Sequence, residues 1–312
     1  MIFLVAGLIA SAVLLGCLAG PVLDRAQRSA AAPGIAIACW VAALAGTLIA
    51  GTGMVMVALL SPPGPGHGFL ERLRDCVPHH GDLAIILAAA ASLVLLTACG
   101  SRLARGLPRL VRAVRHRRRH REMLRLVARQ DGRHADVLVL DHPVPVAYSL
   151  PARRRAIVVS SGAKDALSQA EFGAVLAHER AHLRQRHHAL LLMLDLAHAL
   201  LPWLPTVRRA KARLPLLLEM AADDAAARTC GRRALVDALC RLAAAPGVAG
   251  ALGATGGSGA GALVERVRRL ESAGPAKPHQ ILRLATSVFV TTAVAAPLVV
   301  ASLALVRLAV SC

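Results

Sequence analysis

Four long stretches without a charged side chain constrain the fold of this 312-residue chain more than any other feature. They cover 2–20, 33–60, 83–100 and 284–306, and a membrane-spanning helix needs about 20 apolar residues. The composition agrees, because 56% of the residues are hydrophobic although only 2% are aromatic. We therefore predict four transmembrane helices, with buried core helices as the alternative.

The first apolar stretch raises a second alternative, a cleaved signal peptide. Its residues Leu14-Leu15-Gly16-Cys17 resemble a lipoprotein cleavage site. However, no lysine or arginine precedes the stretch, as the start of a signal peptide requires. We therefore expect this helix to be retained in the membrane.

Arginine carries most of the formal net charge of +19, and its distribution predicts how the spans are oriented. Arg25 and Arg28 follow the first span, and ten arginines lie between positions 102 and 125, after the third. Because basic loops favour the cytoplasmic side, we expect both termini outside the cell membrane. The domains are then 1–100 with three spans, a cytoplasmic insertion at 101–280, and 281–312 with the fourth span.

The basic segment 102–133 has two readings. It has no interleaved aromatic residues and no recognisable nucleic-acid motif, so direct binding of nucleic acid is not expected. A juxtamembrane helix against anionic lipid headgroups explains the charge better.

The inserted domain begins with strands and continues with a helix. The apolar stretches 137–140, 144–150 and 156–160 predict three strands, separated by proline-containing turns. Ser168 and Glu171 have the spacing of a capping box, which predicts a helix over 169–186.

That helix contains the motif HExxH, as His178-Glu179-Arg180-Ala181-His182. Residues four apart share a helix face, so His178 and His182 present both imidazoles to one point, where zinc could bind. Glu179 is then placed as general base toward an attacking water, which zinc makes more acidic. Histidine-rich surface helices produce this short pattern by chance, but its apolar flanks favour a buried active-site helix.

A candidate third ligand lies in "LPLLLEMAADDAAA", where Glu219 interrupts an apolar helical stretch. Asp223 follows one turn later on the same face. A buried carboxylate needs a partner: zinc for Glu219, and the second ring nitrogen of a ligand histidine for Asp223. The alternative is that both carboxylates form ion pairs with arginines.

HExxH followed by ExxxD resembles the gluzincin metallopeptidases. The predicted order of spans, together with "SLPARRRAIVVSSGAKDALSQAEFGAVLAHERAHLRQRHH" and "VERVRRLESAG", resembles the BlaR/MecR-type membrane metallopeptidases, the antirepressor proteases of beta-lactam resistance. The resemblance implies Zn²⁺ bound by His178, His182 and Glu219, with Glu179 as the catalytic base and Asp223 as an orienting residue.

The same resemblance implies that an extended substrate pairs with an edge strand at Val146, Ala147 and Tyr148. It also implies a protein substrate, a cytoplasmic transcriptional repressor of the BlaI/MecI type. The chain departs from the family at His187, where an acidic residue is common, and we expect His187 to be a partly exposed residue at the helix end.

The sequence thus predicts a mainly α membrane protein. Four transmembrane helices would carry a cytoplasmic α+β gluzincin-like metallopeptidase domain, inserted between spans three and four. The predicted function is that of a signal-transducing zinc metalloendopeptidase. Two alternatives are an HtpX-like membrane quality-control metalloprotease and a non-catalytic signalling or scaffold protein with a degenerate metal site.

Overall fold

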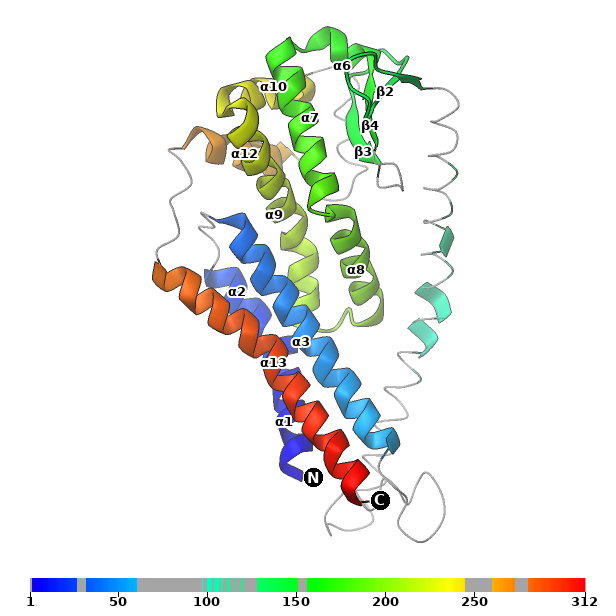
Figure 1. Ribbon diagram of the computed structural model, residues 1–312, viewed down its shortest axis with the longest axis vertical. Coiled ribbons are helices and arrows are strands. Elements are labelled where there is room, and N and C mark those ends of the chain that lie inside the picture. Colours follow the sequence, from blue (N-terminus) through cyan, green and yellow to red (C-terminus); the bar gives the residue numbers. More distant parts are fainter. Residues whose placement is uncertain are drawn as a thin grey trace.

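The computed structural model describes residues 2–26, 32–60, 128–150, 156–244, 260–272 and 280–311, with isolated positions between 97 and 119. Within these ranges the chain is mostly helical. A helical bundle occupies one end of the molecule and a small sheet the other, with long helices running between them (Figure 1).

Three helices among the described residues are long and apolar enough to cross a membrane, at Ala6–Ala26, Pro33–Met56 and Arg283–Arg307. The first is continuous through α1 (Ile2–Val13), the π-helical turn η1 (Leu14–Leu18) and α2 (Ala19–Ala26). The others are α3 (Pro33–Leu60) and α13 (Gln280–Ser311). Almost all of the predicted span at 83–100 lies outside the described residues, so the total of four and the orientation stay predictions.

Small residues let these helices approach closely. A Cβ atom added to Gly46 of α3 would lie 2.1 Å from the carbonyl oxygen of Ala293 in α13. One added to Gly53 would lie 2.8 Å from the Cβ of Ala301. Only glycine therefore permits this approach of α3 to α13, as is common where membrane helices pack.

The sheet has four strands in the order β1-β2-β4-β3. They are β1 (Arg129–Gln130), β2 (Val137–Leu140), β3 (Ala147–Leu150) and β4 (Ala156–Ser160). β2 and β4 are parallel, whereas β1 pairs with β2 and β3 pairs with β4 in antiparallel register. β3 is therefore an edge strand, as predicted.

The strand boundaries at 137–140 and 156–160 are confirmed, but the predicted strand at 144–150 begins later, at Ala147. Pro145 has no N–H to donate to a ladder. The N–H of Val146 donates to the side-chain oxygen of Ser160, at the end of β4, at 2.9 Å and not to a backbone carbonyl. Val146 thus lies just before β3, while Ala147 and Tyr148 lie in it.

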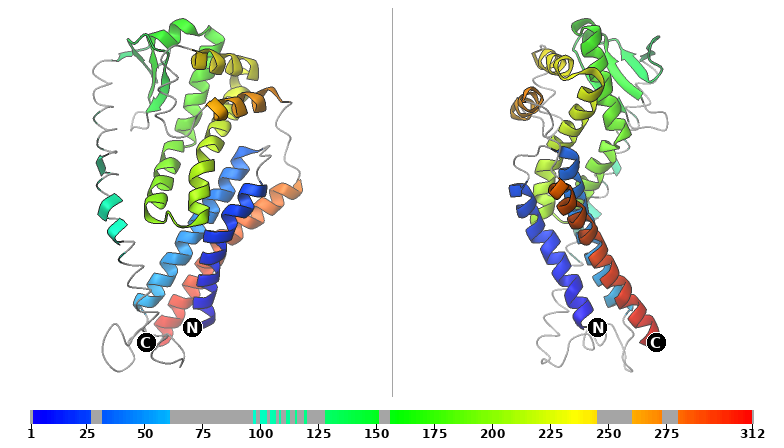
Figure 2. Two further views of the ribbon diagram at one scale, coloured as in Figure 1. Left: turned by 180° about the vertical axis from the view of Figure 1, so that it is seen from behind. Right: turned by 60° about the vertical axis from the view of Figure 1, so that its left-hand side comes forward.

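The remaining helices connect the sheet to the spans: α6 (Ser161–Ala166), α7 (Gln169–Arg184), α8 (His187–Leu200), α9 (Pro205–Cys230), α10 (Arg232–Ala244) and α12 (Ala260–Glu271). α7 covers the sheet, with Leu176 and Leu183 packed on buried residues of β2 and β4. α8 and α9 form a hairpin that runs down beside α3 (Figures 1 and 2).

The capping box that starts α7 is confirmed, with Ser168 as N-cap and Glu171 reaching back to its N–H. The helix ends at Arg184, two residues before the predicted end. Arg186 adopts a left-handed conformation, with φ of 54°, which turns the chain into α8. This turn sets the direction of the two histidines that follow it.

Candidate metal centre

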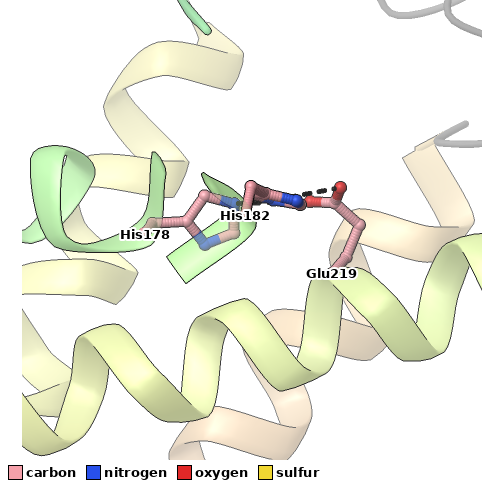
Figure 3. A group of neighbouring side chains, drawn as sticks. All are labelled: His178, His182 and Glu219. Atoms are coloured by element: carbon pink, nitrogen blue, oxygen red, sulfur yellow. Dashed lines mark hydrogen bonds and ion pairs between the residues drawn. The ribbon is translucent and has the colours of Figure 1, made fainter. Parts of the chain in front are cut away.

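Two helices bring the predicted ligands together. His178 and His182 lie one turn apart on α7, and their Nε2 atoms are 3.0 Å apart. Glu219 projects from α9, with Oε2 3.5 Å from Nε2 of His178 and Oε1 3.5 Å from Nε2 of His182. Figure 3 shows the three side chains converging on one point.

The donor set and its spacing fit zinc. One ligand atom from each of these residues lies within 4.8 Å of the others. Tetrahedral bonds of about 2.0–2.1 Å would separate ligand atoms by about 3.3 Å, close to the spacing found. Three protein ligands, two of them imidazoles, are typical of a catalytic zinc site that keeps a position for water or substrate.

His178 lies between two carboxylates. Its Nδ1 atom is 3.0 Å from Asp223, and its Nε2 atom is 3.5 Å from Glu219. Burial alone would lower the pKa of His178, but Asp223 and Glu219 outweigh it and raise that pKa to about 10. The two carboxylates thus favour positive charge at His178, and a metal ion would take over the charge that the proton otherwise supplies.

His182 is oriented by a different group. Burial, followed by repulsion from His178, lowers the pKa of His182 to about 3, so its ring is neutral, as a metal ligand requires. Its Nδ1 atom lies 2.9 Å from Nδ1 of His187, whose Nε2 atom lies 3.0 Å from Oε1 of Gln185. If Nε2 of His182 held a metal ion, its Nδ1–H would donate to His187, and His187 would in turn donate to Gln185.

The prediction for His187 was wrong. We expected a partly exposed side chain at a helix end, but His187 is only 1% exposed. The left-handed turn at Arg186 directs it back toward α7. Burial lowers the pKa of His187 to about 4, which keeps its ring neutral and able to accept a hydrogen bond from His182.

Glu179 lies beside the ligands on α7 and faces the edge strand. Burial raises the pKa of Glu179, and hydrogen bonds with Ser149 of β3 oppose that rise only in part. The Oγ atom of Ser149 also lies 3.0 Å from Nε2 of His188. The predicted base is therefore held against β3, a contact that the sequence did not reveal.

Arg266 of α12 is the functional residue that sequence reasoning missed most clearly. Its Nε and Nη2 atoms donate to the two oxygens of Asp223, at 2.8 and 2.7 Å. Its Nη1 atom lies 3.0 Å from Glu219. Burial would raise the pKa of Glu219, but the contact with His178 and the charge of Arg266 leave that pKa well below its usual range.

An ion pair with Arg266 and a contact with zinc can thus exist at the same time for these carboxylates. Oε1 of Glu219 lies toward His182, whereas Oε2 lies between His178 and Arg266, so the carboxylate faces the histidines and pairs with the arginine at once. This answers the alternative raised from the sequence. Arg266 follows Asp223 by 43 residues, and "VERVRRLE" offers three arginines with no local signal to choose among them.

Comparison with known proteins gave one family. The model of peptidase family M48 matches residues 113–215, which include His178, Glu179 and His182 and end before Glu219. No curated protein and no solved structure matches the chain. The match supports a metallopeptidase of family M48, whose members are generally zinc-dependent. With the three apolar helices it indicates a membrane metallopeptidase.

Proposed function

We propose that this protein is a membrane-anchored, zinc-dependent endopeptidase. One observation carries the proposal: the ligand atoms of His178, His182 and Glu219 converge, and Glu179 lies beside them against the edge strand β3. The proposed metal site and the proposed base would thus lie next to the strand edge that is proposed to bind the peptide.

His178, His182 and Glu219 would hold the zinc ion, which, when bound, polarises the scissile carbonyl and makes water nucleophilic near neutral pH. Glu179 takes a proton from the attacking water as the new O–C bond forms. It then passes this proton to the amide nitrogen as the C–N bond breaks, releasing an amine and a carboxylic acid. The raised pKa of Glu179 suits both steps, since the group must accept and return a proton.

The substrate would bind as an added strand. Of the described strands, only β4 pairs with β3, so the other edge of β3 has N–H and C=O groups available for an extended peptide. Ala147 and Tyr148 would form that edge, with Val146 at its entrance. Ser149 would link peptide binding to Glu179.

The resemblance to the BlaR/MecR-type proteases suggests a cytoplasmic substrate, a transcriptional repressor of the BlaI/MecI type. In that arrangement the peptidase domain faces the cytoplasm, both termini lie outside the cell membrane, and the spans receive a signal. Anionic lipid would bind the basic segment 102–133, whose described arginines are all exposed. Direct binding of nucleic acid is not part of this function.

A second candidate is membrane quality control of the HtpX type. It is favoured by the short path from the spans to the site. Glu219 follows Thr206 by 13 residues on α9, a rise of about 20 Å, and Thr206 contacts the first span. A polypeptide leaving the membrane would come close to the metal centre.

The test uses purified protein, wild type and Glu179→Gln, with zinc content measured beside cleavage of casein and of a candidate repressor. We expect one zinc site in both proteins and a rate that is about 10²–10⁴-fold lower in the variant. Equal cleavage by both would reject Glu179 as the base. Zinc bound without any cleavage by the wild type would favour the scaffold alternative.

A further inference from the structure

The hairpin of α8 and α9 reaches deep into the level of the membrane spans. Gly16 is the middle residue of the span Ala6–Ala26, ten residues from either end, and thus about 15 Å along the helix from each. A Cβ atom added to Gly16 would lie 3.4 Å from Cδ2 of Leu204, at the hairpin tip. Figures 1 and 2 show the tip beside α3, partway along the length of that helix.

Hydrogen bonds fix this depth. The Oγ1 atom of Thr206 accepts from the N–H of Gly20 and donates to the carbonyl of Leu15, both at 2.8 Å. The carbonyl of Leu15 lies within the π-helical turn of the first span, and the N–H of Gly20 lies two residues beyond its end. Thr206 is fully buried, so the tip is anchored to the span and does not merely lie near it.

The tip has the chemistry of a membrane-embedded turn. Positions 196–207 contain no aspartate, glutamate, lysine or arginine. Pro202 and Pro205 carry no N–H, and the N–H groups of Leu201 and Leu204 donate to carbonyls within the hairpin, at 2.8 and 3.2 Å. In hydrocarbon every backbone polar group must be satisfied internally, and this turn meets much of that requirement.

The outer face of the hairpin is apolar and exposed. Met193 is 63% exposed and Trp203 is 40% exposed. The guanidinium of Arg102, just beyond the third apolar stretch, lies 5.3 Å from the centre of the Trp203 ring. Farther from the tip, Lys211 and Asp195 form an ion pair that closes the hairpin. Apolar residues toward the tip and paired charges above them match the polarity gradient of one leaflet.

We propose that the tip of the hairpin, Leu200 to Pro205, is inserted among the acyl chains of the leaflet on the side of the peptidase domain. α8 has 14 residues, fewer than the about 20 needed for a span, so the chain enters and leaves on one side. Lipid acyl chains are the occupant of the exposed face because Leu14 and Leu18 of the first span, two residues on either side of Gly16, are also apolar and exposed. This inference does not depend on the proposed activity.

The two tryptophans allow a direct test. Trp40 is 1% exposed in the bundle core, whereas Trp203 is at the tip. We would reconstitute Trp40→Phe, which leaves Trp203 as the only tryptophan, in phosphatidylcholine vesicles with and without brominated acyl chains. Iodide on both sides of the membrane serves as the aqueous quencher. We expect strong loss of Trp203 emission with bromolipid and little loss with iodide.

Trp203→Phe is the matched control, since it reports Trp40 alone and should respond weakly to both quenchers. If Trp40→Phe does not fold, the emission of wild type minus that of Trp203→Phe gives the same signal. Quenching by iodide without quenching by bromolipid would place the tip in water and overturn the proposal. Protection from both quenchers would mean that protein, such as a second copy of the chain, covers the tip, and would overturn it equally.

Discussion

At the scale of the residue, the metal centre depends on how buried charge is neutralised. Asp223 is fully buried; each of its two oxygens accepts a hydrogen bond from Arg266, and Oδ1 also lies against His178. Glu219 is less buried and is shared between Arg266 and the histidines. One guanidinium therefore holds both the candidate metal ligand Glu219 and the carboxylate beside the candidate ligand His178.

We predict that Arg266→Met weakens zinc binding about 10–100-fold, because Glu219 and Asp223 lose the group that positions them. Zinc affinity would be measured by competition with a chromophoric chelator. Arg269→Met is the matched control, since Arg269 makes a similar two-bond pair from α12 to Asp224 on α9, at 2.8 Å. Unchanged or tighter zinc binding in Arg266→Met would refute the positioning role. If Arg266→Met is unstable, zinc affinity would be measured on Arg266→Lys instead.

At the scale of the element, the start of α7 is fixed by its capping box. Glu171 accepts a hydrogen bond from the N–H of Ser168 at 2.7 Å, and Arg241 of α10 donates to its other oxygen at 2.8 Å. The bond to Ser168 is the main cause of the lowered pKa of Glu171, opposed by burial and helped by Arg241. The helix that carries HExxH is thus tied to α10 through an ionised carboxylate.

This carboxylate gives a pH-dependent contribution to stability of known sign. The pKa of Glu171 lies below its ordinary 4.5 in the folded protein, so its stabilisation is present above pH 4.5 and is lost as pH falls through the folded value. We predict that Glu171→Gln melts at a lower temperature than wild type at neutral pH, and that the gap narrows below pH 4.5. Glu265→Gln, on the exposed face of α12, should show no gap. A difference in melting temperature between wild type and Glu171→Gln that stayed constant at all pH values would contradict the prediction.

At the scale of the whole molecule, the spans and the peptidase helices share one core. Trp40 of α3 is buried in a cluster that also contains Ala19, Leu23, Leu194 and Leu214. These residues come from the first span and from both arms of the hairpin, so α9 links the membrane bundle to the metal centre without a flexible joint. Close packing of the spans should therefore matter for the stability of the entire molecule.

We predict that Gly46→Ala lowers the unfolding temperature of the detergent-solubilised protein, with a loss of about 1–3 kcal/mol for overpacking. The added Cβ would lie 2.1 Å from the carbonyl oxygen of Ala293, so α3 and α13 must separate. Gly51→Ala is the control on the same helix, because a Cβ at Gly51 meets nothing within 4 Å. Equal unfolding temperatures for the two variants would show that this contact does not limit stability.

The features that the sequence determined by itself are those set by local geometry. An uncharged stretch of sufficient length indicates a span wherever it packs, and the three such stretches that the structure describes are helices. The spacing of His178, Glu179 and His182 fixes their faces on one helix, and the spacing of Ser168 and Glu171 fixes its first turn. Glu219 and Asp223 were found in the same way, one turn apart in an apolar stretch.

The tertiary structure alone decided what these groups meet. Arg266 reaches Asp223 from 43 residues away, Ser149 reaches Glu179 from a strand, and His187 is turned inward by one left-handed residue. The depth of the hairpin depends on Thr206 meeting a π-helical turn 191 residues earlier, at Leu15. Helical periodicity operates over a few residues and can be read from spacing, whereas these contacts depend on how separate elements pack, which no local pattern encodes.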